Sequence, residues 1–591
     1  MRLQDIPIQI DETRDSLLTE FGKTTLKKQY CLPNESYQEA FARASKAFCG
    51  GDTALAQRLY DYSSKLWFSF ATPLLSNGGT NRGLPISCFL NYVHDSIHGL
   101  ADNFRENAFL STNGGGIGTY WGHVRSVGES TSKGVETPGV MPFMHVQDAQ
   151  MLAYHQGRTR RGAVATYMDV SHPEIFDFVS MRQSTNGDVH RKNENLHHGV
   201  CISDAFMEAV AADGMWQLVD PHSGHVHDTV KARDLWIKIL MQRLNFGEPY
   251  LFFVDTANRA LPSTMKDKGL YVHHSNLCTE ITLPTSPSRT AVCCLSSINV
   301  AKRDEWWDVR DQFVLDLVTM LDNVLDVFCE LAPEPMWRAV KSAQAERSIG
   351  LGTLGLFTYF QQQHWSMEDP AAQHFNRKFY EWLKSSAVKA SQSLADERGE
   401  PEDMKGTGMR HAHLLSIAPN ASSSIICGGV SPSIEPLVAN AFVQKTKSGS
   451  HEVRNPALQQ RLSSLGLDTE EIWTSIVTNN GSVQHLHQLS AEDKEVFRTA
   501  AEMEAQPMVE LAADRQPYIC QAQSVNLFLA SNITTKQLHT VHFSAWKMGL
   551  KSLYYVRSSS VKSTSVGLLP EALLPEATVC NLDGECKSCE G

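Results

Sequence analysis

The chain has 591 residues, 42% of them hydrophobic and 20% charged, and a formal net charge of −12. This composition is typical of a soluble globular protein, and the negative charge argues against an extended nucleic-acid surface. No apolar run is long enough to span a membrane, and the N-terminus carries acids where a signal peptide needs a basic patch and an apolar core. The 13 cysteines, an odd number, favour reduced thiols over a disulfide framework, so we expect a cytoplasmic protein, in a host cell if a virus encodes it.

The predicted elements change character along the chain. Residues 35–70 show helical periodicity broken at Gly50-Gly51, which predicts two helices within an N-terminal helical region, residues 1–70. Over residues 71–560, short apolar runs alternate with amphipathic stretches, which indicates an α/β core, barrel-like or doubly wound. Within it, residues 95–110 and 311–332 are predicted to be long helices. Residues 561–591, rich in Ser and Pro, predict a mobile tail.

Three loops carry features of anion binding. The three consecutive glycines of STNGGGIGTY (111–120) would let backbone N–H groups approach an anion closely. In APNASSSIICGG (418–429), serine hydroxyls and amides at a helix start could hold phosphate, or a serine could simply cap the helix. The basic loop QGRTRRGA (156–163) could contact a base or a phosphate, or be solvated.

The stretch HHSNLCTEI (273–281) places Asn276, Cys278 and Glu280 at every second position. That spacing predicts a strand with all three side chains on one face, and a solvent-exposed edge strand is the alternative. The trio suits a substrate with two neighbouring hydroxyls, because the carboxylate can take a proton and the amide can bind the second hydroxyl. A carboxylate disfavours a nearby thiolate, so the thiol is better suited to exchange a hydrogen atom than to act as a nucleophile.

Further thiols and two tyrosines become candidate functional residues only when they are considered together. Cys88 and Cys293 lie in apolar, strand-like runs, and each alone is best explained as a core residue. Cys586 and Cys589 form a CxxC pair. Only Cys580 lies nearby and no histidine does, so a dithiol shuttle is favoured over zinc. Tyr554 and Tyr555 are adjacent, and a strand would divide such a pair between core and surface.

Together these segments resemble the large, catalytic α subunit of class I ribonucleotide reductase from about residue 20 to the C-terminus. The resemblance includes ATPLLSNGGTNRGLPISCFL, GGGIG, EPYLFFVDTANR, SNLCTEI, ERSIGLGTLGL, APNASSSI, GLKSLYY and the terminal CxxC, in that order. It implies a ten-stranded α/β barrel with the Cys278 segment on a central finger loop. This places the strand expectation in doubt but keeps the three side chains together.

The resemblance implies reduction of ribonucleoside diphosphates to 2′-deoxyribonucleoside diphosphates, which supplies DNA precursors. Cys278 would become a thiyl radical that removes the 3′ hydrogen, Glu280 would act as general base, and Asn276 would bind the substrate hydroxyls. Cys88 and Cys293 would supply the electrons and close a disulfide.

The implied partners follow from the remaining motifs. Cys586 and Cys589 would re-reduce that disulfide and be recharged by thioredoxin or glutaredoxin. Tyr554 and Tyr555 would relay the radical from the metal cofactor of a separate, ferritin-like β subunit. For this chain we expect no metal site, no covalently bound cofactor, no nucleic-acid partner and no membrane contact.

The resemblance also implies which residues bind substrate and effector, by their positions in the matching motifs. Those expected at the substrate are Thr72, Ser87, Gly116, Pro419, Ala421, Ser422, Ser423 and Ser424. Those expected at a nucleoside triphosphate effector are Asp95, Ser96, Ile97 and Arg125, with the loop 126–140. The loop 156–163 would relay effector identity to the substrate base, and an α homodimer is implied when effector is bound.

The sequence departs from the family's pattern in two places, and three other classes of protein are alternatives. Core-like sequence begins by about residue 20, so the N-terminal ATP-binding domain of many relatives is expected to be missing. The effector loop looks short. A class II reductase, which uses adenosylcobalamin, is disfavoured by the tyrosine pair, and a glycyl-radical reductase by the terminal dithiol. A non-catalytic nucleotide-binding regulator would not need all five redox cysteines.

Overall fold

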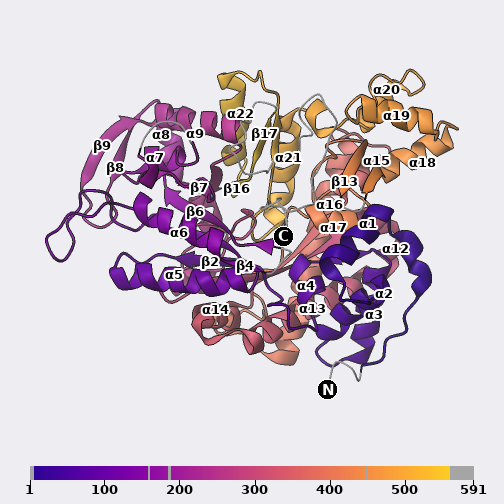
Figure 1. The fold of residues 1–591 in the computed structure, drawn as a ribbon, viewed down its shortest axis with the longest axis horizontal. Helices are drawn as coiled ribbons and strands as arrows, with labels where there is room; N and C mark the ends of the chain where they lie inside the picture. Colours follow the sequence, from indigo (N-terminus) through magenta and orange to yellow (C-terminus); the bar gives the residue numbers. More distant parts are fainter. Residues whose placement is uncertain (1–5, 157–159, 184–187, 447–448, 559–591) are drawn as a thin grey trace.

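The computed structural model describes residues 6–156, 160–183, 188–446 and 449–558, and its centre is a barrel of strands surrounded by helices (Figure 1). One half of the barrel consists of five strands that run parallel to one another. They are β2 (Cys88–Tyr92), β3 (Gly116–Tyr120), β6 (Ala163–Asp169), β7 (His197–Ile202) and β10 (Tyr250–Phe253).

The other half is built from β11 (Ala291–Asn299), β12 (Ile349–Leu354), β16 (Ser552–Leu553) and two extended segments, 415–417 and 521–525. Isolated parallel bridges connect Leu351 to Leu415 and Ile417 to Gln523. The halves meet antiparallel where β2 pairs with β11 and where β10 pairs with β16. The Tyr554 N–H, directly after β16, donates to the Val525 carbonyl at 2.8 Å, which closes the ring. The expected ten-stranded α/β barrel is confirmed, with these two bridged segments counted as strands.

The predicted N-terminal helices are present, and local chemistry explains their ends. Ser36 and Glu39 form a capping box that starts the first, because each side chain accepts a hydrogen bond from the other residue's backbone N–H. Gly50 and Gly51 then adopt positive φ angles of 62° and 88°, which favour glycine and reverse the chain. This region contains α1 (Glu20–Thr25), α2 (Tyr37–Ala47), α3 (Thr53–Ser64), β1 (Phe68–Phe70) and α4 (Thr72–Asn77).

Long helices cover the barrel, and the two predicted near residues 95–110 and 311–332 are confirmed as α5 (Ile97–Thr112) and α13 (Arg310–Leu331). The other covering helices are α6 (Met141–Ala153), α7 (Ile175–Val179), α8 (Asp204–Ala211), α9 (Ala232–Phe246), α10 (Val254–Arg259), α11 (Ser263–Asp267), α12 (Arg303–Trp306), α14 (Trp337–Glu346), α15 (Leu356–Gln362), α16 (Pro370–Arg398), α17 (Ala421–Ile426), α21 (Ala505–Arg515) and α22 (Thr535–Lys547).

Smaller units lie at the periphery. The helices α18 (Pro456–Ser464), α19 (Glu470–Thr478) and α20 (Ala491–Val496) have a small core of their own beside β13 (Ala441–Thr446) and β14 (Gly449–Arg454). On the opposite side, β8 (Met215–Val219) and β9 (Val226–Lys231) form a projecting hairpin (Figure 1). Two short pairs remain, β4 (His155–Gln156) with β5 (Arg160–Arg161), and β15 (Leu527–Leu529) with β17 (Val556–Ser558). In the part of the chain that the structure describes, no helix is long and apolar enough to cross a membrane.

Candidate active site

The segment with Asn276, Cys278 and Glu280 is a turn, so the strand expectation is wrong. Thr279 has a φ of +66°, which is incompatible with a strand and folds the chain back. The turn brings the Asn276 Nδ2 within 2.9 Å of Glu280 Oε1, to which it donates a hydrogen bond. The side chains therefore cluster by chain reversal and not by strand alternation.

This turn lies inside the barrel, because strands of both halves bind its backbone. Tyr167 of β6 donates its hydroxyl to the Asn276 carbonyl at 2.6 Å. From the other half, Ser524 donates to the Cys278 carbonyl at 2.6 Å and Ser552 to the Thr279 carbonyl at 2.8 Å. The segment 271–285 is thus a central finger loop, as the resemblance implied.

Two glycines of β3 allow this loop to approach the barrel wall. A Cβ on Gly118 would overlap the Ser275 carbonyl oxygen, and one on Gly116 would lie 3.1 Å from Leu277 Cδ2. The Gly116 N–H is already bound to the Ser87 carbonyl at 2.6 Å. The GGGIG motif therefore provides room for the finger loop, a role that the anion-binding interpretation did not include.

Glu280 is fully buried and lies among hydrogen-bond donors. Asn276 donates to its Oε1, and Ser524 donates to its Oε2 at 3.2 Å. Burial disfavours the charged form and raises the pKa of the carboxyl to about 7, although the hydrogen bonds from Asn276 and Ser524 lower it. A carboxyl with this pKa can accept and return a proton near neutral pH.

Cys88 and Cys293 are directly opposed across the antiparallel junction of β2 and β11. Residues opposed in this way point to the same face, with Cα atoms about 4.5–5.5 Å apart, within the range that a disulfide spans. Both are buried, and burial raises the pKa of Cys293 well above its usual value. Gln521 donates to the Cys293 sulfur at 3.3 Å. The two thiols can therefore form a disulfide without a large movement of the backbone.

The Tyr554 and Tyr555 rings are in contact, with centroids 4.3 Å apart and planes tilted by 50°. Tyr554 and Cys278 belong to the same buried cluster. Tyr250 of β10 contacts both tyrosines, with ring centroids at 4.9 Å and 5.1 Å. The Tyr555 hydroxyl lies 3.3 Å from His197 Nδ1. A continuous group of aromatic rings thus lies beside the finger loop.

The serine loop forms the start of α17. Asn420 adopts a left-handed conformation with φ 56°, and its amide is fixed by Ser297 and by the Thr353 carbonyl. Ser423 and Ser424 are buried, while Ser422 and Ala421 are partly exposed, and Pro419 precedes them. Thr72, at the start of α4, hydrogen-bonds with Tyr30 at 3.2 Å.

The expected effector residues group at the start of α5. Arg125 donates to both carboxylate oxygens of Asp95, at 2.9 Å and 3.1 Å. Ser96 caps α5 by accepting from Gly99 N–H at 3.0 Å, and Ile97 is 72% exposed. Arg125 also donates to the Ser130 carbonyl at 2.7 Å, which connects this group to the loop 126–140.

Some expected residues and parts of loops lie outside the described residues. These are Cys586 and Cys589 in the tail, and residues 157–159 in the loop 156–163.

Sequence reasoning missed four residues that surround the trio: Tyr167, Tyr250, Gln521 and Ser524. Three of them are far from residues 273–281 in sequence and belong to unremarkable apolar or polar stretches. Tyr250 lies in EPYLFFVDTANR, one of the segments that carried the resemblance, and this was the one signal that could have singled it out.

A closed α/β barrel with opposed buried thiols, a thiol on a central finger loop and a carboxyl of near-neutral pKa fits an enzyme of thiol-based redox chemistry. Comparisons identify its family. A family model described as the ribonucleotide reductase barrel domain matches residues 86–407 and 400–556, and a model of the all-alpha domain of the same enzyme matches residues 16–83.

Relatives match over nearly the whole chain. A large-subunit homologue from Frog virus 3 (isolate Goorha) is 46% identical, covering 93% of this chain and 95% of the viral one. The ribonucleoside-diphosphate reductase large subunit of Invertebrate iridescent virus 3 is 40% identical, covering 99% of this chain and 100% of its own. Among solved structures, the class Id ribonucleotide reductase alpha subunit of Actinobacillus ureae matches with a TM-score of 0.82 and 35% identity, covering 96% of this chain and 99% of its own.

The chain belongs to the ribonucleotide reductase large-subunit family. It is accordingly an oxidoreductase that converts ribonucleotides to deoxyribonucleotides.

Proposed function

We propose that Cys278, as a thiyl radical, removes the 3′ hydrogen atom of a ribonucleoside diphosphate bound at the tip of the finger loop. The observation that carries this assignment is the burial of Cys278, Asn276 and Glu280 on one turn inside the barrel. Glu280 takes the 3′-hydroxyl proton, and Asn276 binds the hydroxyls. The pKa of about 7 at Glu280 supports its role as base.

The electrons for the reduction come from Cys88 and Cys293. As the 2′-hydroxyl leaves with a proton as water, the two thiols are oxidised to a disulfide and together supply two electrons to the sugar. Cys278 then returns a hydrogen atom to the 3′ carbon and regains its radical. The opposed positions of Cys88 and Cys293 on β2 and β11 support this pairing.

Turnover requires partners. The tail thiols Cys586 and Cys589 reduce the new disulfide by exchange, and thioredoxin or glutaredoxin then reduces the tail. Tyr554 and Tyr555 relay the radical from a ferritin-like β subunit, whose metal cofactor generates it. The ring separation of 4.3 Å supports transfer between these tyrosines. We place the reaction in the cytoplasm, where thiols stay reduced.

Substrate phosphates bind at the α17 start, through Ser422, Ser423, Ser424 and the neighbouring backbone N–H groups of Asn420 and Ala421, which follow Pro419. Thr72, Ser87 and Gly116 lie nearby. A nucleoside triphosphate effector binds at Asp95, Ser96, Ile97 and Arg125. Effector binding joins two copies of the chain through the adjacent helices α5 and α6, where Val146 and Leu152 are about half exposed.

The radical assignment is tested by Cys278→Ser in the full chain combined with its β subunit. We expect CDP reduction to be lost while CDP binding stays within about twofold of the wild type. Cys294→Ser is the matched control, because Cys294 is equally buried on β11 but its thiol donates to Leu321 carbonyl, outside the site. Retained CDP reduction by Cys278→Ser would refute the assignment.

A further inference from the structure

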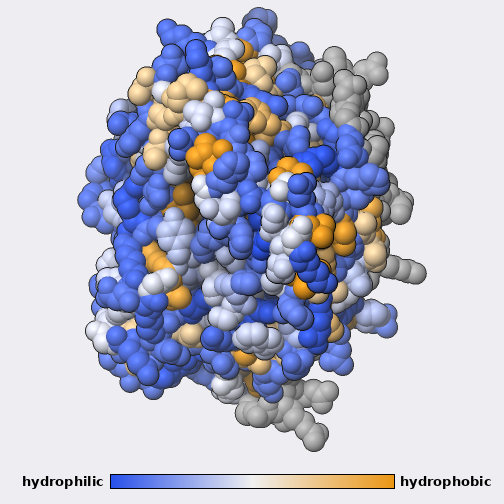
Figure 2. Space-filling view, turned by 90° about the vertical axis from the view of Figure 1, so that its left-hand side faces the viewer, coloured by the Kyte–Doolittle hydropathy of each residue, from blue (hydrophilic) through white to orange (hydrophobic). Residues whose placement is uncertain are grey.

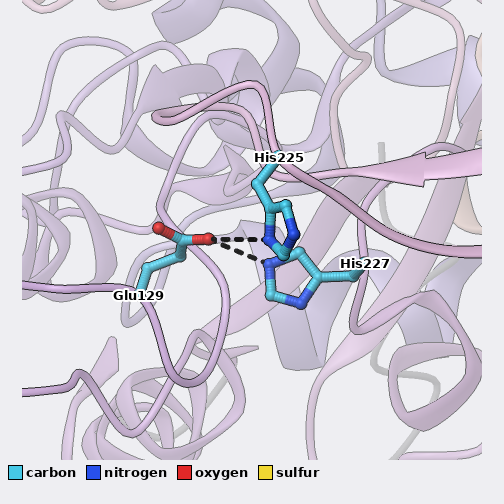
Figure 3. Close-up of side chains that lie close together, drawn as sticks. All are labelled: Glu129, His225 and His227. Carbon is cyan, nitrogen blue, oxygen red and sulfur yellow. Dashed lines mark hydrogen bonds and ion pairs between the residues drawn. The ribbon is translucent and has the colours of Figure 1, made fainter.

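Three side chains that the proposed chemistry does not use converge beside the effector residues (Figure 3). Glu129 comes from the loop 126–140, and His225 and His227 come from the turn and first strand positions of the β8–β9 hairpin. One Glu129 oxygen faces both imidazoles, and ligand atoms of all three residues lie within 4.8 Å of one another. Two imidazoles and a carboxylate form a donor set that binds zinc and related divalent ions.

The spacing of these atoms fits a metal ion. Zinc binds nitrogen and oxygen at about 2.0–2.2 Å, so ligands in tetrahedral positions lie about 3.3–3.5 Å apart. Glu129 Oε1 lies 3.0 Å from His227 Nε2 and 3.7 Å from His225 Nδ1, values on either side of that separation. Small side-chain movements would bring both distances to the separation of tetrahedral ligands.

The hairpin turn is held in place independently of these three residues. Asp220, which is buried, accepts hydrogen bonds from the backbone N–H groups of His222 and Ser223 at 2.9 Å and 2.7 Å. Its other oxygen accepts from the backbone and hydroxyl of Ser126 at 2.7 Å and 2.8 Å. The turn and the start of the loop 126–140 are thus already joined, which fixes the histidines relative to Glu129 before any metal arrives.

The three side chains are partly exposed to solvent, which leaves room for a further ligand. The Glu129 side chain is 16% exposed, the His227 side chain 27% and the His225 side chain 67%. Water can therefore occupy the remaining coordination position, as in open zinc sites. Figure 2 shows the face to which this hairpin belongs as mostly hydrophilic, with scattered apolar side chains. An ion could reach the site from solvent.

We propose that Glu129, His225 and His227 bind one divalent zinc-class ion, which fastens the loop 126–140 to the β8–β9 hairpin. The sequence predicted no metal site in this chain, and none of the reaction steps proposed above uses one. Two of the ligands form a His-x-His pair, with His225 just before β9 and His227 within it, and the third is distant in sequence.

The ion would also act on the effector site, an extension that rests on the proposed function. Arg125 binds Asp95 and the Ser130 carbonyl, the residue next to Glu129. Fixing Glu129 therefore restrains the loop to which Arg125 is bound. We expect a bound ion to increase affinity for the effector triphosphate.

The site is tested by titrating Co²⁺, a spectroscopic substitute for Zn²⁺, into the full-length, chelator-treated chain. We expect one equivalent with visible d–d absorption and no sulfur-to-metal charge transfer, which distinguishes it from cysteine sites. His227→Gln and Glu129→Gln should each weaken this binding by more than about 100-fold, beyond the 10–100-fold typical of residues that only support a ligand. His222→Gln is the control from the same turn, because its imidazole faces Asp95.

Equal Co²⁺ binding by the wild type and His227→Gln, or a spectrum of thiolate ligation alone, would overturn the metal site. Circular dichroism of the metal-free variants checks that they are folded. As a second measurement, Zn²⁺ should slow tryptic cleavage after the exposed Lys133 in the wild type and not in Glu129→Gln. If Zn²⁺ binds but leaves dTTP and ATP affinity unchanged, the effector coupling is wrong and the metal site stands.

Discussion

Glu280 lies in an environment that is unusual for a carboxyl. A carboxyl is normally ionised at neutral pH, but here it is fully buried, and the side chains that donate hydrogen bonds to it, Asn276 and Ser524, are uncharged. Burial therefore prevails, and the pKa rises to about 7. Both its proposed catalytic role and its expected effect on stability follow from this value.

Activity should depend on the ionisation of Glu280. A base must be deprotonated, so kcat/KM for CDP reduction should fall about tenfold for each pH unit below about 7. Single-turnover assays with prereduced enzyme, from pH 5.5 to 8.5, avoid the pH dependence of the external reductant. The affinity between α and β subunits, measured at each pH, is the control. A rate that is constant between pH 5.5 and 7 would contradict the role of Glu280 as base.

The same carboxyl should destabilise the fold at alkaline pH. Its folded pKa, about 7, lies above the ordinary value of 4.5, so the folded state retains a proton that the unfolded state releases. This carboxyl therefore does not lower the free energy of unfolding below about pH 4.5. Its destabilising contribution grows as the pH rises to about 7 and stays at about 3 kcal/mol above that. Glu280→Gln removes this cost.

We expect the gain in apparent Tm of Glu280→Gln over the wild type to be larger at pH 8 than at pH 5, although the variant loses turnover. Differential scanning calorimetry at the two pH values measures this gain. All other titrating groups are common to both proteins and cancel in the comparison. A gain that is the same at both pH values would show that the carboxyl is ionised in the folded state at pH 5.

At the scale of elements, the position of the finger loop depends on the strand β3, against which it packs. The loop carries Asn276 and Cys278, and it reaches the barrel wall only because Gly118 has no side chain. Such close approach between a loop and a strand is a specific requirement for glycine. The position of the proposed radical site thus depends on a residue of the barrel wall.

Gly118→Ala should displace the loop while preserving the barrel. The new Cβ would overlap the Ser275 carbonyl oxygen and lie 2.9 Å from the Asn276 Cα, so the backbone must move. Because a displacement of about 1 Å can reduce a rate about 100-fold, we expect at least that loss in CDP reduction. Gly214→Ala is the control, since its nearest neighbour would lie at 3.6 Å. Wild-type turnover in Gly118→Ala would contradict this account.

The elements also show what the sequence could and could not predict. The helices near residues 35–70, 95–110 and 311–332 were predictable, because capping residues, glycines and apolar periodicity are local. The grouping of Asn276, Cys278 and Glu280 was predicted with the wrong geometry, because alternation resembles a strand and the positive φ of Thr279 has no local signal. Ser524 and Gln521 could not be found, since only the barrel brings them to the loop.

For the whole molecule, the helices α5 and α6 place the proposed effector site and an apolar surface side by side. The two helices pack together, and Gln150 of α6 donates to the Phe104 carbonyl of α5 at 2.6 Å. Ile97 at the start of α5, and Val146 and Leu152 on α6, are 72%, 49% and 48% exposed. A second copy of the chain would bury these apolar side chains, which favours association.

Introducing charges on that surface should abolish the proposed effector-dependent dimer. With a panel of ATP, dATP, dGTP and dTTP, we expect at least one to shift the wild-type chain from monomer to dimer in sedimentation velocity. Val146→Asp combined with Leu152→Asp should stay monomeric, because burying two carboxylates in an apolar interface is unfavourable. Leu465→Asp at the end of α18, on the opposite side of the molecule, is the control and should still form dimers (Figure 1). A double variant that forms dimers as the wild type does would place the interface elsewhere.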